Sequence, residues 1–145
     1  MQLKITTDYA IRMILYLANK KEITNSIQIS DELGIPWKYL INIGSMLKHA
    51  GLINTHKGKH GGYTLAKSAE TIRIYDIIST TEKNIKINRC LEGEEYCSAD
   101  VANNCKVKIF YSTVQEKIEQ YFKGVTIADL VEDAEGKEPF TAFLN

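Results

Sequence analysis

Residues 26–65 read SIQISDEL GIP WKYLINIGSMLKHA G LINTH KGKHGG YTL, and this stretch decides the fold. Apolar residues at helical spacing predict a short helix over 26–33 and a longer helix over 36–50. Gly34 follows the first helix at the position that a helix C-terminus favours. A short helix, a tight turn with glycine and a longer helix make a helix-turn-helix, although an ordinary helical hairpin shows the same pattern.

A glycine-rich β-hairpin is expected directly after these two helices. Residues 52–56 form a first short strand, 63–65 a returning strand, and 57–62 the turn between them. A hairpin in this position is a wing, which favours the helix-turn-helix over the helical hairpin. Its tip carries three side chains that are expected to contact a phosphate or the minor groove, rather than only to solvate a loop: Lys57, Lys59 and His60.

Four more helices are predicted around this motif, over residues 6–19, 71–80, 105–122 and 126–133. Thr6 or Thr7 is expected to cap the first of them. The short helix of the motif is expected to turn three apolar side chains inward, from Ile27, Ile29 and Leu33. The predicted fold class is therefore mainly α with a small β-hairpin: a winged helix-turn-helix head plus a long dimerisation helix.

An apolar seam runs along the helix over 105–122. Its apolar positions follow one another at intervals of four, three, four and three residues, the heptad spacing at which a partner helix packs alongside. Packing onto the chain's own head is the alternative, but a seam beyond a compact head favours dimerisation. The homodimer is expected to form through Val107, Tyr111, Val114, Ile118 and Tyr121.

The charge of the chain is divided between its two parts. Residues 1–67 carry nine cationic and four acidic side chains, a net of +5, and the remainder balances this with −5. A basic part joined to an acidic part is typical of a nucleic-acid-binding unit with a separate regulatory or assembly unit. The expected division is a DNA-binding domain over 1–80, a cysteine-containing loop over 81–105, and the dimerisation helix with its tail over 106–145.

Composition speaks against several classes of protein. With 44% hydrophobic and 25% charged residues in 145, the chain has the mixture of a globular domain rather than of a disordered one. No apolar run approaches the length of about 18–20 residues that crosses a bilayer, and nothing resembles a signal peptide, so a cytoplasmic protein without membrane contact is expected. The chain offers no paired nucleophile and base and no phosphate-cradling loop, so an enzyme is not expected.

Three cysteines form a C-x6-C-x7-C array at Cys90, Cys97 and Cys105. Their odd number and their clustering speak against a secreted disulfide scaffold. Thiolates are the soft ligands of iron–sulfur clusters, and the irregular sequence between these cysteines suits a chain that wraps a cluster. Cys105 opens the long helix, where unpaired amides and the helix dipole favour a thiolate. Zinc binding, reversible thiol oxidation and inert cysteines are the alternatives.

Several segments together resemble one family. They are LKITTDYAIR at 3–12, IPWKYL at 35–40, LKHAGLI at 47–53, KGKHGGY at 57–63, and the three cysteines. Their order is similar to that in the Rrf-type winged-helix transcriptional regulators, the IscR/NsrR/CymR family, and the resemblance covers residues 1–133. It implies a homodimer that binds double-stranded DNA at a pseudo-palindromic operator. It also implies an iron–sulfur cluster held by three cysteines, with a four-iron cluster favoured over a two-iron one.

The resemblance leaves the fourth ligand of such a cluster open. IscR-like members place a histidine three residues after the last cysteine, where this chain has Lys108, and a charged lysine does not bind iron. NsrR-like members place an aspartate near the start of the first helix, at a position that corresponds to Asp8 and reaches the other subunit's cluster. Asp8 is either this ligand or an ordinary first-turn carboxylate beside the helix dipole. The expected metal ligands are Cys90, Cys97, Cys105 and Asp8.

The resemblance also places four side chains on the exposed front of the helix over 36–50: Trp37, Lys38, Tyr39 and Asn42. An amide pairs bidentately with adenine, so Asn42 is the expected base reader. Phosphate contacts position a protein without reading sequence, and they are expected from Lys38, Lys48 and Lys59. Lys57 lies near the arginine that IscR-like wings insert into the minor groove, and Trp37 has an alternative as a core or interface aromatic.

Two functions fit these observations. The first is a repressor whose operator affinity is controlled by an iron–sulfur cluster that senses nitric oxide, oxygen or iron–sulfur status. The second is a cluster-free, CymR-like repressor that is controlled by a protein partner or by reversible oxidation of its cysteines. The cysteine array appended to a basic winged head favours the first.

Overall fold

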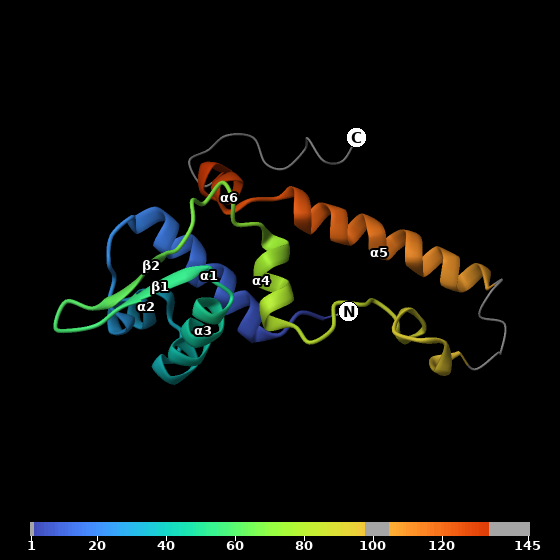
Figure 1. Cartoon of the computed structure of the whole chain (residues 1–145), viewed down its shortest axis with the longest axis horizontal. Helices are drawn as coiled ribbons and strands as arrows, with labels where there is room; N and C mark the ends of the chain where they lie inside the picture. The colour runs from blue at the N-terminus through green and yellow to red at the C-terminus, as the bar shows by residue number, and fades with distance from the viewer. Residues whose placement is uncertain (1, 98–104, 134–145) are drawn as a thin grey trace.

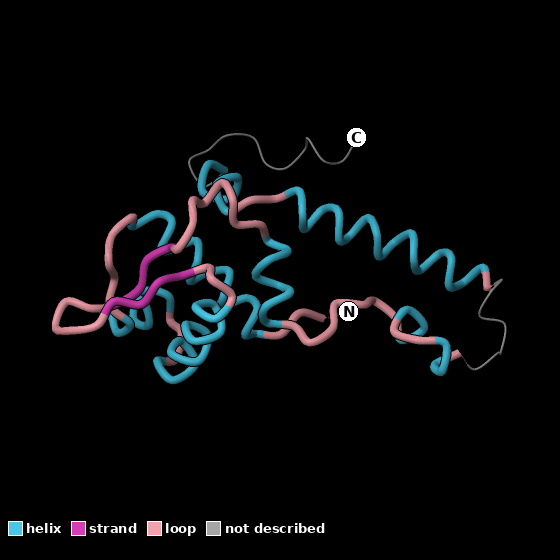
Figure 2. The backbone as a smooth tube through the Cα atoms, in the orientation of Figure 1, coloured by secondary structure: helices cyan, strands magenta, loops and turns pink. Residues whose placement is uncertain are grey.

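The computed structural model describes residues 2–97 and 105–133 (Figure 1). Over these residues the helices and strands are α1 (Ile5–Lys20), α2 (Ser26–Leu33), α3 (Trp37–His49), β1 (Ile53–His56), β2 (Gly62–Leu65), α4 (Ile74–Thr81), α5 (Lys106–Gly124) and α6 (Ile127–Asp133). Two single 3-10 turns, η1 (Arg89–Leu91) and η2 (Glu94–Tyr96), lie between α4 and α5. This mainly helical architecture with one antiparallel hairpin confirms the predicted fold class (Figure 2).

Local chemistry sets the limits of the helix-turn-helix. The side chain of Asn25 accepts a hydrogen bond from the Gln28 amide at 2.9 Å and so caps the start of α2. Gly34 then takes a left-handed conformation with φ of 63°, which glycine adopts without a Cβ penalty, and its amide bonds back to the Ser30 carbonyl. Pro36 stands directly before α3. The helix-turn-helix follows from these signals as the sequence predicts.

The wing is anchored to the start of α2. Its strands pair from Ile53 opposite Leu65 to His56 opposite Gly62. The backbone of Thr24, just before α2, exchanges two further hydrogen bonds with Tyr63 of β2, at 3.1 and 2.9 Å. Because backbone pairing fixes both position and direction, the wing keeps a set place beside the helix-turn-helix.

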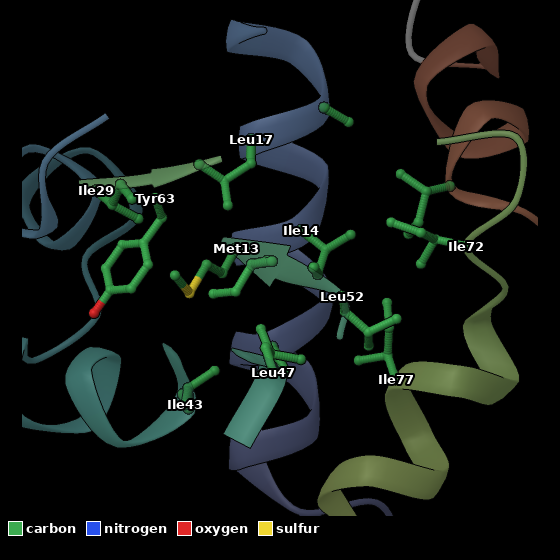
Figure 3. Packing of buried hydrophobic residues seen from close by; sticks show 14 of the residues in the cluster. Met13, Ile14, Leu17, Ile29, Ile43, Leu47, Leu52, Tyr63, Ile72 and Ile77 are labelled. Carbon is green, nitrogen blue, oxygen red and sulfur yellow. The ribbon is translucent and has the colours of Figure 1, made fainter. Parts of the chain in front are cut away.

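The core forms around α1, which runs through the middle of the head. Figure 3 shows Met13, Ile14 and Leu17 of α1 among side chains from α3, the wing and α4. All three are at most 2% exposed. A fully buried side chain of this size contributes about 1.5–3 kcal/mol relative to exposure, so α1 is the element that holds the head together.

Two expectations about side chains are wrong. Ile27 is 64% exposed, because a residue two positions from buried Ile29 lies on the opposite side of a helix. Neither Thr6 nor Thr7 caps α1, which begins earlier, after Lys4. Thr7 is instead fully buried, and its hydroxyl shares a 2.8 Å hydrogen bond with that of Thr81 at the end of α4.

Beyond α4 the chain leaves the head and returns to it. α5 projects from the head, and the segment after α4 runs beside it (Figure 1). α6 then packs back onto α1. The backbone of α6 is held there by the Ile127 amide, which donates to the Ile72 carbonyl at 2.9 Å. Among the described residues, no helix is both long and apolar enough to cross a membrane.

Candidate nucleic-acid interface and cysteine loop

α3 divides cleanly into a buried and an exposed face. Leu40, Ile43 and Leu47 are at most 1% exposed and hold the helix on the core. The predicted DNA-reading residues lie on the other side, where Lys38, Asn42 and Lys48 are all exposed. Because their side chains are free of the core, they are available to a ligand along the whole length of α3.

Glycine allows the close packing of α3 against the wing. A Cβ at Gly44 would lie 2.8 Å from the hydroxyl oxygen of Tyr63, closer than side chains normally approach. Gly44 is fully buried within α3, and Tyr63 is 9% exposed. The spacing between α3 and β2 therefore depends on glycine at this position.

Two aromatic residues at the start of α3 tie it to other helices. Trp37 is 53% exposed, and its Nε1 donates to Ser26 Oγ of α2 at 3.0 Å. Tyr39 is 51% exposed and meets Tyr9 of α1 edge-on, with ring centroids 6.4 Å apart. Trp37 is thus a surface residue that joins the two helices of the motif, and a core role for it is wrong.

The wing tip is cationic and fully accessible. Lys57, Lys59 and His60 are all exposed at the turn. Behind them, a polar pocket of about 290 Å³ lies between the wing turn and the start of α2. Its lining includes Asn25, Ser26, Thr55, His56 and the backbone of the wing glycines. A basic tip beside a helix start and glycine backbone is a combination that accepts an anionic phosphate.

The three cysteines lie in the segment between α4 and α5. Cys90 sits in η1, where its amide donates to the side chain of Asn88 at 3.1 Å. Cys97 follows η2, and Cys105 is the residue directly before α5. All three are half-buried. Cys105 therefore holds the position at a helix start that the sequence predicts.

A stacked pair links the residues that directly precede the first two cysteines. The guanidinium of Arg89 lies over the ring of Tyr96, 4.8 Å from its centroid. Arg89 directly precedes Cys90, and Tyr96 directly precedes Cys97. A contact of this kind contributes about 0.5–1 kcal/mol at an exposed site, so it favours conformations in which η1 and η2 stay together.

The thiols suit an iron–sulfur cluster chemically, but the described part of the single chain does not assemble a complete site. No group of three or more His, Cys, Asp or Glu side chains within residues 2–97 and 105–133 stands close enough to hold a metal ion. Asp8 is half-exposed and pairs with Arg12 one helical turn away, at 2.9 Å. In the single chain Asp8 therefore engages Arg12 and belongs to no such group of described residues.

The predicted seam of α5 is only partly covered within the single chain. Val107 is 58% exposed and Tyr121 39%, while Tyr111, Val114 and Ile118 are half-buried. Two neighbours outside the seam are even more exposed, Ile109 at 61% and Phe110 at 63%. The apolar surface of α5 is broader than a single heptad seam.

Sequence reasoning missed two polar residues that organise the loop. Gln115 is 4% exposed and is the one fully buried residue of α5, all of which the structure describes. Glu82 ends α4 with its side chain 6% exposed. In the sequence both residues resemble ordinary surface residues, a glutamine between seam positions and a glutamate at a helix end. Only the four-residue spacing of Gln115 and Glu119, at which two side chains of a helix can contact, indicates a hydrogen bond there.

Comparison with known proteins gives the family. The model of the Rrf2 family, described as "Iron-dependent Transcriptional regulator", matches residues 3–133. An HTH-type transcriptional regulator NsrR of Shouchella clausii (strain KSM-K16) is 34% identical over 134 residues, covering 90% of this chain and 89% of that protein. A helix-turn-helix regulator of Aquifex aeolicus (strain VF5) is 32% identical over 127 residues, covering 87% and 88%.

Solved structures share the fold. CymR, the global cysteine regulator of B. subtilis, superposes with a TM-score of 0.75 at 22% identity, over 91% of this chain and 97% of that one. T. potens IscR superposes with a TM-score of 0.74 at 22% identity, over 100% and 97%.

Proposed function

Because the chain belongs to the Rrf2 family of transcriptional regulators, we propose that it is a homodimeric repressor whose operator affinity is controlled by an iron–sulfur cluster at the cysteine loop. DNA binding and regulation of transcription come with the family, whose members are not enzymes. The operator contacts, the dimer and the cluster make up the proposal. The division into a DNA-binding domain over 1–80, a cysteine loop over 81–105 and a dimerisation part over 106–145 belongs to it as well.

The operator contacts follow from the exposed side of α3 and the wing. Asn42 reads an adenine edge in the major groove, since its amide has one donor and one acceptor to offer. Lys38 and Lys48 flank it and contact phosphates, with Trp37 and Tyr39 bracing the start of the helix. Lys57, Lys59 and His60 add the wing contact to the adjacent backbone or minor groove.

The dimer follows from the uncovered apolar surface of α5. Val107, Ile109 and Phe110 are each more than half exposed in the single chain. Large apolar side chains gathered on one projecting helix are costly in water, so a second α5 is the occupant that hides them. Two heads held in this way read half-sites about 34–36 Å apart, or a small multiple of that distance.

One observation carries the cluster: three half-buried thiols lie in the loop that connects the DNA-reading head to the dimerisation helix. The family description as iron-dependent and the NsrR relative support it. Cys90, Cys97 and Cys105 would hold the cluster, with Asp8 of the second subunit as the fourth ligand. When bound, an iron–sulfur cluster supplies a centre that reacts with nitric oxide, oxygen or oxidants.

The chain's own groups prepare this site. Asn88 fixes the backbone at Cys90, and the stack of Arg89 on Tyr96 closes the turn between the first two cysteines. Cys105 stands at the N-cap of α5, so its thiol lies at the start of the helix that follows the loop.

A second function is favoured by the same stack. Because Arg89 and Tyr96 stack directly before Cys90 and Cys97, reversible oxidation of these thiols is the input of a cluster-free repressor like CymR.

Anaerobic purification separates the two functions. A brown protein with broad visible absorption and matching amounts of iron and acid-labile sulfide supports the cluster. A colourless protein with three titratable thiols, whose operator binding changes on mild oxidation, supports the cluster-free repressor instead. Cys97→Ser serves as the control, because it removes one expected ligand and should abolish the colour.

A further inference from the structure

We propose that Glu82 and Gln115 are positioning residues that turn residues 82–87 into a strap between α1 and α5. The strap, as residues 82–87 are called below, begins where α4 ends and stops three residues before Cys90. The inference deepens the proposed function, since it states how the cysteine loop acts on the DNA-reading head. The strap itself depends only on contacts within the chain.

The first end of the strap holds the start of α1. The Glu82 carboxylate accepts hydrogen bonds from the Lys4 amide, at 2.8 Å, and from the Thr7 hydroxyl. It also pairs with the Lys4 ammonium at 3.1 Å. Three donor atoms from the start of α1 thus meet at one buried carboxylate that is far away in sequence. The amide at the start of α1 has its acceptor 78 residues away instead of in a local cap.

The second end of the strap is held by α5. Gln115 Oε1 accepts from the Ile87 amide at 2.8 Å, and Gln115 Nε2 donates to the Ile85 carbonyl at 3.1 Å. The same Nε2 donates to Glu119, which pairs with Lys86 at 3.1 Å. One amide side chain therefore satisfies both a donor and an acceptor of the strap backbone, as a neighbouring strand would.

Both contacts are costly to break. A buried carboxylate or amide that loses its partners keeps the full desolvation penalty, and so do the groups that it leaves behind. An apolar residue at position 115 would extend the hydrophobic surface of α5, but it would leave two backbone groups of the strap without partners. Gln115 is therefore fitted to hold the strap rather than to fill space.

The strap is continuous with the DNA-reading surface. Thr7, which binds Glu82, is two residues before Tyr9, and Tyr9 packs edge-on against Tyr39 of α3. A displacement of the cysteine loop or of α5 is thereby passed to the first turn of α1 and to the front of α3. The test measures this coupling between the two ends of the strap directly.

The test is hydrogen exchange, followed by mass spectrometry, on the reduced, metal-free, full-length protein. Gln115→Ala breaks the strap at α5, and we expect exchange to rise about tenfold, equivalent to about 1.4 kcal/mol, both at residues 85–87 and at the distant residues 7–12 of α1. Gln120→Ala is the matched control, an exposed glutamine of the same helix, and should change neither segment. Faster exchange confined to 85–87 would show a merely local role and overturn the proposal.

A second variant reads the strap from its other end. Glu82→Gln keeps the shape of the side chain but removes its charge, and exchange should rise at residues 7–12 and also at the Ile87 amide, with Glu92→Gln as the exposed control. Combined with Gln115→Ala, its effect on residues 7–12 should be less than additive, and additive effects would overturn the proposal. Since no metal is present, failure to assemble a cluster would refute the proposed function and leave these outcomes unaffected.

Discussion

The rings of Tyr9 and Tyr39 meet edge-on at an interplanar angle of 81°, with centroids 6.4 Å apart. This contact joins the first helix of the head to the front of the helix that is expected to read DNA. Edge-to-face aromatic pairs contribute about 0.5–1.5 kcal/mol beyond the area that they bury. The same turn of α1 carries Asp8, so any force on Asp8 acts one residue away from this contact.

Two substitutions should separate base reading from phosphate binding. Asn42→Ala should cost about 1–3 kcal/mol of operator affinity and relax the preference at one base pair, because it removes a bidentate contact. Lys59→Ala should weaken binding to all sequences alike and lower the salt dependence by about one phosphate contact. The measurement is affinity for a panel of operator variants at several salt concentrations. The same sequence profile for both mutants would contradict this division of roles.

The dimer should depend on the apolar side of α5. Replacing Val114 and Ile118 together with glutamate should give monomers, since two buried charges without partners are not tolerated at an interface. Operator affinity should fall with the loss of the second half-site. Light scattering gives the mass, and Lys117→Glu, at an exposed position between the two, is the charge control. A double mutant that stays dimeric would show that the seam is assigned wrongly.

The dimer interface on α5 extends beyond the heptad seam if two further exposed apolar residues take part. Ile109 and Phe110 lie outside the heptad positions but are the most exposed apolar residues of α5. If the partner helix covers more than one face, Phe110→Glu should weaken the dimer as strongly as a change at Val114. A Phe110→Glu protein with an unchanged dissociation constant would confine the interface to the seam.

The fold was predictable where the signals are local. Gly34 ends α2 in the left-handed conformation that its position indicates, and the glycine-rich turn at 57–62 closes the wing as expected. Apolar periodicity placed each helix within a few residues. The predicted burial of Ile27 failed, because residues two positions apart share a face in a strand but not in a helix.

The contacts between distant segments were not predictable from single positions. Glu82 supplies the acceptor for the start of α1 from 78 residues away, and no local pattern marks it. Gln115 is one of many polar residues of α5 and nothing in the sequence sets it apart as a buried one, yet its partners are backbone groups of another segment. Tertiary hydrogen bonds of this kind depend on how two distant segments are placed against one another, and local sequence patterns do not predict that placement.

Gly44 should be intolerant of even one methyl group. Gly44→Ala would place a Cβ 2.8 Å from the buried Tyr63 hydroxyl, so α3 or the wing strand must move. Overpacking of this kind costs about 1–3 kcal/mol of unfolding free energy. Chemical denaturation measures it, with Ser45→Ala at the next, exposed position as the control. Equal stability of the two variants would show that Tyr63 moves aside freely.

Acid should weaken the contact between Glu82 and α1. Burial raises the pKa of Glu82, but the hydrogen bonds from Thr7 and Lys4 outweigh burial and leave this pKa below its ordinary value. A carboxyl group with a lowered folded-state pKa stabilises the fold above its unfolded value of about 4.3, and this contribution disappears as the pH falls through the folded pKa. The stability difference between the wild type and Glu82→Gln should therefore be full at pH 7 and shrink below about pH 4.3. Urea unfolding over a pH series measures it, and a difference independent of pH would contradict it.

Asp8 should affect the lifetime of a bound cluster rather than its assembly. A carboxylate is a harder and weaker ligand for iron than a thiolate, so Asp8→Ala should give a protein that still assembles a cluster but loses it faster. Cys97→Ala should prevent assembly, because it removes one of three thiolates. Both variants should shift operator affinity in the same direction, the first in part and the second fully. Cluster absorbance over time and anaerobic gel shifts provide the two measurements.

Arg12→Ala is the matched control for Asp8→Ala. It breaks the same 2.9 Å ion pair with Asp8 but keeps the carboxylate. An exposed ion pair contributes only about 0–1 kcal/mol, so Arg12→Ala should leave both cluster lifetime and operator response close to those of the wild type. If Arg12→Ala and Asp8→Ala shorten the lifetime equally, the ion pair and not a ligand explains the effect. If neither shortens it, Asp8 is an ordinary helix-start carboxylate and the fourth ligand lies elsewhere.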